Sequence, residues 1–402
     1  LAIPFVIGIG FLVQPFIAKH TEKVMEVGKD KNALMIESLT GIETVKSTGS
    51  SQLFLNRYQD SIEDGSEAGR MSKVLSQLAT NSASSAQMLC LISIVFYGTI
   101  LIDEGVVSMG AMVAAVLLSS RAIAPLALIA SLFGRLNSTK TAYRELDMLM
   151  NQVSADESES LGLKIHQLGE LNCSRVGFTY PNNTTPSLIE FNAAIRPGER
   201  IAIMGRNASG KTTLIKLLSG LLMPTQGVIT FDNLATSEIH PSVFHSKVSV
   251  VLQETNLFAG SIRENILMGR DQIKESMIKN AMECSGVSSF ISHIPGGLDG
   301  VITDRGLSLS AGQRQAISIA RALVINPEML IMDEPTASLD LNAEQAFVKN
   351  LNPFIKEKTM IVVTHRLPLL ELVDRIIVIA DGKVALDGPR DQILEQLKAK
   401  KS

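Results

Sequence analysis

The sequence has few cysteines and no excess of positive charge. Its 402 residues carry a net charge of −3 at pH 7, so it lacks the overall basic field that favours nucleic-acid binding. No nucleic-acid partner is therefore predicted. The three cysteines, Cys90, Cys173 and Cys284, lie far apart and lack the spacing of metal ligands. We interpret them as buried free thiols of a reducing compartment.

The sequence also lacks a recognisable signal peptide, internal repeats and low-complexity tracts. The sequence begins at Leu1, inside an apolar run, without the charged region and the cleavage site of a signal peptide. It contains no internal repeat and no low-complexity tract. We expect the protein to continue upstream of Leu1.

Charge is absent or nearly absent from three N-terminal segments. Residues 1–18 and 74–102 carry none, and 106–133 carry only Arg121. Their lengths and apolar character predict membrane spans at about 1–18, 78–102 and 106–130. Taken alone, the first segment could instead be a buried helix of a soluble protein. Arg121 either faces a cavity or partner, or marks the cytosolic end of its helix.

The distribution of lysine and arginine predicts the orientation of these spans. The connection 19–73 holds eight of these residues, whereas the turn 103–105 holds none. Because cytosolic loops are enriched in lysine and arginine, 19–73 is predicted to be cytosolic and the turn external. The third span then returns to the cytosol, and the rest of the chain stays there.

The remainder of the chain changes character after a polar linker at 151–165. Short β-branched runs alternate with helical segments over 166–402, a pattern that predicts an α/β domain with a largely parallel sheet. The chain is thus predicted to join a partial α-helical transmembrane domain, 1–150, to an α/β domain. The runs that indicate strands are 200–204, 247–252, 329–332 and 360–363.

A glycine-rich loop between a strand and a helix gives the first chemical signal. Residues 205–212 read GRNASGKT, which fits the P-loop pattern, and they follow the strand-like run Ile201–Met204. Backbone N–H groups of such a loop face phosphates, Lys211 would reach the outer phosphates, and Thr212 would ligate Mg²⁺. The nucleotide-binding residues predicted here are Gly205, Arg206, Asn207, Ala208, Ser209, Gly210, Lys211, Thr212 and Thr213.

A second apolar strand, Met329–Met332, ends in two acidic residues. In a P-loop fold this is the Walker B strand. Asp333 would then hold Mg²⁺ through water, and Glu334 would polarise the attacking water. Two acids after a strand are usually just a solvated strand end, but the upstream P-loop favours the functional interpretation.

The segment LSAGQ, residues 309–313, resembles the signature motif of the ABC transporter superfamily. It lies just before the Walker B strand and opens a helix. The resemblance implies a P-loop ABC nucleotide-binding domain, in which two copies enclose two ATP molecules. Each signature then serves the partner's nucleotide, and a homodimer is expected. The signature residues implied in this contact are Ser310, Ala311, Gly312 and Gln313.

Four further residues match this family in order and spacing. Tyr180 resembles the aromatic residue that stacks on adenine, although it could simply be a core strand residue. Gln253 resembles the Q-loop glutamine, which senses Mg²⁺, and Asp340 lies in a D-loop-like segment. His365 resembles the switch histidine at the γ-phosphate. The resemblance thus implies Glu334, Gln253 and His365 as catalytic residues and Thr212, Gln253 and Asp333 as Mg²⁺ ligands.

Three residues depart from the family pattern. Ala208 and Ala311 stand where glycine is usual, and Asp304 stands where exporters usually have glutamate. Alanine costs little where φ is negative and disfavours a loop where φ is positive. A methyl group at 311 could hold backbone amides away from the partner's phosphate, so Ala311→Gly is expected to raise turnover.

The N-terminal half is also similar to exporters, above all to type I secretion ATPases. Residues 33–50 resemble the second cytosolic loop, with a coupling helix at about 47–55, and 108–132 resemble the sixth membrane helix. The family carries six helices per half, so three more are expected upstream. The resemblance implies a multi-pass protein of the bacterial inner membrane that exports a polypeptide with a periplasmic adaptor and an outer-membrane channel. An exporter of lipids, drugs or small peptides, and a non-transporting or regulatory ATPase, are the alternatives.

Overall fold

The computed structural model describes residues 2–119, 121, 139–150, 170–181, 183–303, 306 and 308–399. The chain divides into two compact units, Leu1–Ser154 and Ala155–Ser402. The linker predicted at 151–165 and Asp304 lie outside the described residues, as do residues 122–130 of the third predicted span.

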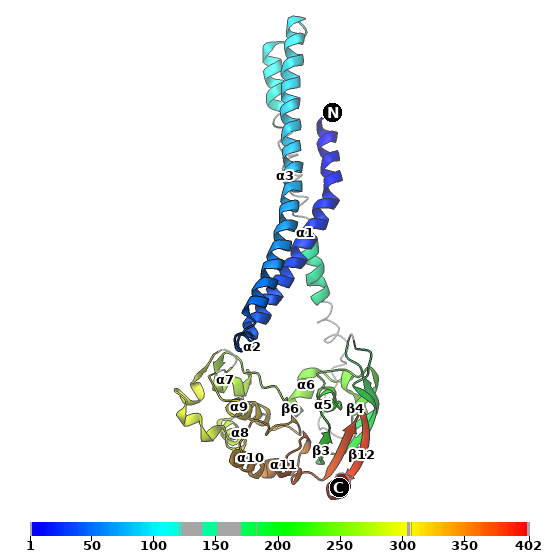
Figure 1. Ribbon diagram of the computed structural model, residues 1–402, viewed down its shortest axis with the longest axis vertical. Coiled ribbons are helices and arrows are strands. Elements are labelled where there is room, and N and C mark those ends of the chain that lie inside the picture. Colours follow the sequence, from blue (N-terminus) through cyan, green and yellow to red (C-terminus); the bar gives the residue numbers. More distant parts are fainter. Residues whose placement is uncertain are drawn as a thin grey trace. The chain divides into compact units, whose positions relative to one another are not determined.

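The first unit is helical. Its described elements are α1 (Ala2–Thr40), α2 (Ile42–Ser47), α3 (Ser51–Asp103) and helical residues at 109–119 and 139–150. Helices α1 and α3 lie side by side (Figure 1). The coupling helix was predicted at about 47–55. The short helix α2 ends at Ser47, and residues 51–55 form the first turns of α3.

The predicted spans fall on these helices. The first lies in α1, the second in α3, and the described part of the third includes the helical residues 109–119. Within the part of the chain that the structure describes, no helix combines the length and the hydropathy needed to cross a membrane.

The second unit confirms the predicted α/β fold. A six-stranded sheet has the order β12-β11-β3-β10-β9-β6, in which only β12 is antiparallel to its neighbour. A four-stranded antiparallel sheet has the order β2-β1-β4-β5, and β7 pairs with β8. The strands are β1 (Leu171–Phe178), β2 (Leu188–Ile195), β3 (Arg200–Gly205), β4 (Gln226–Phe231), β5 (Leu234–Ala235), β6 (Val248–Val251), β7 (Gly260–Ser261), β8 (Val301–Ile302), β9 (Met329–Asp333), β10 (Thr359–Val363), β11 (Arg375–Ala380) and β12 (Lys383–Pro389).

The helices of this unit follow the strands in alternation, as a parallel sheet requires. Helices α7 to α10 gather at the end of the unit away from β4 and β12 (Figure 1). The helices are α5 (Lys211–Leu218), α6 (Pro241–Lys247), α7 (Ile262–Leu267), α8 (Glu275–Ser285), α9 (Ala311–Leu323), α10 (Leu341–Phe354), α11 (Leu367–Leu370) and α12 (Arg390–Ala399). Short 3₁₀ helices are η1 (Thr236–Glu238), η2 (Val287–Ser289), η3 (Ile291–His293) and η4 (Gly297–Asp299).

Two hydrophobic cores lie on opposite faces of the six-stranded sheet. Because side chains alternate along a strand, Ile361 and Val363 of β10 enter the core with α5 and the antiparallel sheet. Met360 and Val362 enter the core with α7, α8 and α9. All residues of β9 and β10 are buried, which explains their continuous apolar sequences.

The cysteines only partly follow the expectation from the sequence. All three are free, and Cys173 and Cys284 are buried, but Cys90 is only half-buried. Burial raises the pKa of the Cys173 and Cys284 thiols to about 12. Neither thiol is therefore a nucleophile at neutral pH.

Strand register brings distant chain segments to one edge of the six-stranded sheet. Val363 of β10 lies opposite both Ile203 of β3 and Asp333 of β9. Met332 of β9 in turn lies opposite Val251 of β6. The loops that follow β3, β6, β9 and β10 therefore begin side by side, at the carboxyl ends where ligands bind in such folds.

Candidate functional site

The loop between β3 and α5 is shaped by two glycines with positive φ. Gly205 has φ 157° and Gly210 has φ 101°. A Cβ on Gly205 would lie 2.3 Å from the carbonyl oxygen of Ile379, and one on Gly210 would lie 2.4 Å from that of Ser187. Any side chain at either position would displace neighbouring backbone, so the loop requires glycine at both.

Polar groups of this loop are arranged for an anion. Lys211 is buried, and its Nζ donates hydrogen bonds of 2.8 Å to the carbonyl oxygens of Gly205 and Arg206. The buried Oγ of Ser209 has no hydrogen-bond partner among the described residues. Buried hydroxyls normally have a partner, and a phosphate oxygen would supply one. The loop thus fits the phosphates of a nucleotide.

The remaining residues of the predicted loop differ in exposure. Arg206, Asn207 and Ala208 are exposed at the turn, whereas Thr213 is buried in α5. The Oη of Tyr180 lies 3.4 Å from Thr213 Oγ1. The half-buried Tyr180 ring packs edge-on against Phe178 at 4.9 Å between centroids. The structure thus brings Tyr180 beside the start of α5 and also packs it against the core.

Thr212, in the first turn of α5, meets Asp333 at the end of β9. Thr212 Oγ1 donates a hydrogen bond of 2.9 Å to Asp333 Oδ2. Asp333 is buried, and burial together with the nearby charge of Glu334 raises the pKa of its carboxyl, although the bond from Thr212 opposes this rise. A bound cation would offset the same cost.

This pair fits Mg²⁺ but not a cage of protein ligands. Within the described ranges, no group of three or more His, Cys, Asp and Glu residues could hold a metal. Mg²⁺ commonly keeps its waters and binds through one or two protein groups plus substrate phosphates. Thr212 and Asp333 match that requirement. Gln253, the third predicted ligand, is exposed two residues after the end of β6.

Glu334 and His365 line one small cavity of about 160 Å³, together with Thr336 and Arg366. The backbone N–H of Glu334 donates to the carbonyl oxygen of Val363 at 2.9 Å, which joins the ends of β9 and β10. Glu334 has φ 47°, a conformation that is costly for a residue other than glycine. Such outliers cluster at active sites.

The signature residues form a separate group at the start of α9. Ser310 Oγ accepts a hydrogen bond of 3.2 Å from the Gln313 N–H, and Gln313 Oε1 accepts one of 2.9 Å from the Ser310 N–H. This reciprocal capping box fixes the first turn. Asp340 caps α10 through a single bond, since its Oδ1 accepts a bond of 2.8 Å from the Ala343 N–H.

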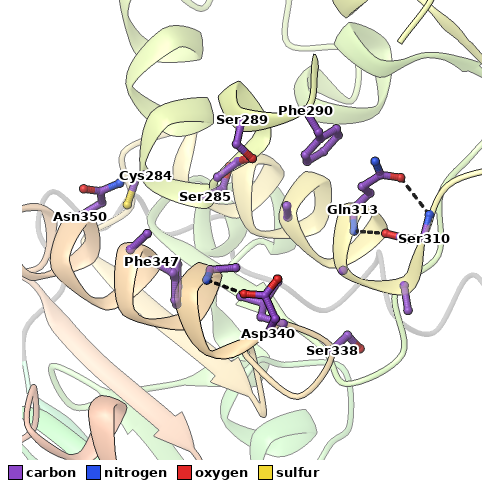
Figure 2. A pocket seen from close by; sticks show the side chains of 17 residues that line it. Cys284, Ser285, Ser289, Phe290, Ser310, Gln313, Ser338, Asp340, Phe347 and Asn350 are labelled. Carbon is purple, nitrogen blue, oxygen red and sulfur yellow. Dashed lines mark hydrogen bonds between the residues drawn. The ribbon is translucent and has the colours of Figure 1, made fainter. Parts of the chain in front are cut away.

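These two helix starts share a cavity of about 520 Å³ (Figure 2). Ser310, Gln313 and Asp340 line it, together with Cys284 and Phe347. In the described part of the chain, no P-loop residue belongs to this lining. The structure therefore divides the predicted site residues into two groups, one around the P-loop and one around the signature.

The two unusual alanines have different backbones. Ala208 has φ 62°, in the left-handed region. Ala311 is the first residue of α9 and lies outside that region. The cost anticipated for alanine at positive φ therefore applies to the P-loop and not to the signature.

Sequence reasoning missed one buried residue near the site. Glu344 on α10 is 1% exposed, and its Oε1 accepts a hydrogen bond of 2.6 Å from Thr336 Oγ1. A single glutamate in an amphipathic helix normally indicates the solvent face. The only sequence signal for its burial was its position four residues after Asp340, on the side of α10 that faces the core.

Two protein-family models match this chain, one in each unit. The model of the ABC transporter transmembrane region matches residues 1–126, and the ABC transporter model matches residues 188–337. A solved structure of a bacterial Atm1-family ABC exporter with ATP bound has a TM-score of 0.90. That alignment covers 98% of this chain and 70% of the exporter at 23% identity, so the two proteins share a fold.

Curated relatives are similar along nearly the whole chain. The Toxin RTX-I translocation ATP-binding protein of Actinobacillus pleuropneumoniae is 29% identical over 98% of this chain. The Alpha-hemolysin translocation ATP-binding protein HlyB of Escherichia coli is 29% identical over 96%, and the Cyclolysin secretion/processing ATP-binding protein CyaB of Bordetella pertussis is 27% identical over 98%.

The alignments cover 55%, 54% and 55% of these three relatives, so the chain spans about half their length. The two family models match successive segments in the order transmembrane region, then ATP-binding domain. This order agrees with the helical unit and the α/β unit of the structure. The chain is a membrane protein that belongs to the ABC transporter family.

Proposed function

We propose that this chain is the ATP-hydrolysing half of a transporter that exports a polypeptide across the bacterial inner membrane, as in type I secretion. The main support is the site at the carboxyl ends of β3, β9 and β10, where Lys211, Thr212 and Asp333 meet. The names of the relatives support the polypeptide cargo, because all three are translocation or secretion proteins for toxins.

Each residue of the P-loop group would have its own role in ATP binding or hydrolysis. The loop N–H groups, Ser209 Oγ and Lys211 Nζ would bind the phosphates of ATP, and Tyr180 would lie against the adenine. Thr212, Asp333 and Gln253 would hold Mg²⁺, and the bound ion would neutralise negative charge on the phosphates. Glu334 would orient and polarise the attacking water.

His365 and Glu334 line the same cavity, which supports a joint role at the γ-phosphate. The histidine would hold the phosphate while the carboxylate accepts a proton from the water. Both groups are fixed by the ends of β9 and β10, which are buried and paired in register. A fixed position matters because catalysis of this kind depends on prior orientation.

A second copy of the chain is the proposed partner that completes the site. Among the described residues of one chain, the signature group and Asp340 line a cavity to which no P-loop residue contributes. The signature also opens helix α9, and the N-terminus of a helix favours an anion. Both observations fit a homodimer in which each signature contacts the ATP bound by the other copy.

The proposed setting is a multi-pass protein of the inner membrane with a cytosolic α/β unit. Along the second predicted span, large apolar side chains of α3 are exposed, among them Met88, Ile92, Phe96 and Ile100. Their spacing of four residues forms a stripe suited to lipid or to neighbouring helices. A periplasmic adaptor and an outer-membrane channel are the further partners that type I secretion would need.

The test is secretion by a strain in which the chromosomal gene carries Glu334→Gln. We expect at least one polypeptide to disappear from the culture medium while the transporter remains in the membrane at the parental level. The matched control is Glu357→Gln, at an exposed carboxylate outside the site. An unchanged set of secreted proteins, with altered lipid composition or drug sensitivity instead, would favour the alternative exporter of small molecules.

A further inference from the structure

Glu344 is a buried carboxylate behind the cavity that Glu334 and His365 line. Its side chain is 1% exposed and extends from the first turns of α10. Glu344 Oε1 accepts a 2.6 Å hydrogen bond from Thr336 Oγ1, and Thr336 is itself 1% exposed. Glu344 Oε2 lies 3.7 Å from Arg366 Nη1. One carboxylate thus contacts two residues of the cavity wall.

The two residues belong to the loops that carry the proposed catalytic groups. Thr336 lies two residues after Glu334, and Arg366 directly follows His365. Both Thr336 and Arg366 line the 160 Å³ cavity, whereas Glu344 does not. Glu344 therefore joins the loop after β9 to the loop after β10 from outside the cavity.

The two contacts differ in strength. A hydroxyl bond of this length to a carboxylate is a strong, charge-assisted bond, and it is shielded from water because both residues are buried. The Arg366 contact is too long for a hydrogen bond, and the Arg366 side chain is 48% exposed. The Thr336 bond should therefore fix geometry, while Arg366 mainly balances the buried charge.

Local backbone bonds carry this constraint toward Glu334. The Ala337 N–H donates to the carbonyl oxygen of Glu334 at 3.1 Å, and the Leu339 N–H donates to that of Thr336 at 3.1 Å. Glu334 thus begins a tight turn that ends at Ala337 and contains Thr336 as its third residue. Holding Thr336 in place also helps to hold Glu334 at its unfavourable φ of 47°.

We propose that Glu344 is a positioning residue for ATP hydrolysis, which fixes the loops of Glu334 and His365 relative to each other. The inference rests on the proposed function. It assigns no contact with ATP to Glu344. Its loss should therefore slow the chemical step and leave nucleotide binding in place.

The first experiment measures steady-state ATP hydrolysis and equilibrium nucleotide binding by the full-length protein carrying Glu344→Gln. Glutamine nearly keeps the shape of the side chain but removes its charge, so the bond from Thr336 loses its charge assistance and Arg366 loses its opposite charge. Because displacements near 1 Å can cost up to about 100-fold in rate, we expect kcat to fall about tenfold. The dissociation constant for ATP should stay within about twofold, because no ATP-binding group is removed.

A second pair of variants tests the same bond from the other side. Thr336→Val removes the hydroxyl at nearly constant shape, and Thr336→Ser keeps it. We expect the valine variant to have the lower kcat of the two, with equal affinity for ATP. The combined Thr336→Val and Glu344→Gln variant should be little slower than the slower single variant, because both changes disrupt one interaction.

The control is Glu357→Gln, which removes an exposed carboxylate shortly after α10. A parental kcat in Glu344→Gln would overturn the inference, as would a loss of rate fully explained by weaker ATP binding. If Glu344→Gln does not fold, the comparison of valine and serine at 336 decides, and equal rates there would also overturn it. A parent protein without ATPase activity would contradict the proposed function instead.

Discussion

The P-loop turn and the start of α9 each carry an alanine where this family usually has glycine, and their backbones differ. Ala208 has φ 62° in a turn between β3 and α5, whereas Ala311 is the first residue of a regular helix outside the left-handed region. The same exchange of residue type is therefore strained in one region and relaxed in the other. Backbone conformation, not residue type, decides its cost.

The glycines near these two alanines also differ in the space around them. Gly205 and Gly210, on either side of Ala208, leave no room for a side chain, because a Cβ at either position would lie within 2.4 Å of a backbone oxygen. At the start of α9, a Cβ on Gly312 would lie 3.0 Å from the Ser338 carbonyl oxygen. The signature therefore has a tight contact at Gly312, one residue beyond the alanine that it tolerates.

The largest expected effect is in the P-loop half. Glu334→Gln should lower the rate of ATP hydrolysis by about 10²–10³-fold, because it removes one preorganised catalytic group. ATP binding should persist, since Lys211 keeps its bonds to the P-loop backbone and Thr212 keeps its bond to Asp333. Steady-state hydrolysis and equilibrium binding on the same preparation would check both expectations. Hydrolysis at the parental rate would remove Glu334 from the proposed mechanism.

The next effect concerns the signature half and should act on stability first. Ser310→Ala removes the oxygen that accepts the Gln313 N–H and should lower the free energy of unfolding by about 1 kcal/mol. Ser310→Gly should lower it by only a few tenths of that amount, because glycine is itself a favourable residue at this position of a helix. Urea unfolding of both variants would measure the difference. Equal stability of the parent and the alanine variant would show that this cap contributes nothing.

Much of the α/β fold could be predicted because its signals are local. Strands β9 and β10 are apolar throughout since both faces of the sheet are covered, and such runs are visible in sequence. The P-loop pattern places Lys211 and Thr212 at the start of α5 by spacing alone. The proximity of Thr212 and Asp333 followed from assigning both residues to the Mg²⁺ site of a P-loop fold.

Other features depend on contacts between distant segments, which a single sequence does not display. The positive φ of Ala208 arises in a loop held against Ser187 and Ile379, which lie far from it along the chain. The burial of Glu344 depends on Thr336 and on the packing of α10. The short helix α2 begins earlier than expected, since the polar sequence around it fits helix and turn alike.

The strained alanine can be relieved directly. Ala208→Gly should raise the free energy of unfolding by about 0.5–1 kcal/mol, because the left-handed region costs alanine roughly 1–2 kcal/mol. Part of this gain is offset by the greater freedom of glycine in the unfolded chain, about 0.4–1 kcal/mol. Denaturant unfolding in the absence of nucleotide is the measurement. A less stable glycine variant would show that the turn accommodates alanine without strain.

Ala311→Gly should give the smallest effect, of the opposite sign. The methyl group of Ala311 lies on the first turn of α9, where no positive φ requires glycine, so the substitution adds freedom to the unfolded chain without relieving strain. Glycine costs about 0.5–1 kcal/mol in an element interior, and a terminal position should show about half of that loss. The helical backbone also removes the reason to expect faster turnover, because the amides of Ala311 and Gly312 are already aligned with the helix axis.

Unfolding and hydrolysis should be measured together on the parent, Ala208→Gly and Ala311→Gly. A rise in hydrolysis by Ala311→Gly would mean that the methyl group itself hinders the partner's phosphate, and the two alanines would then be alike in effect despite their different backbones.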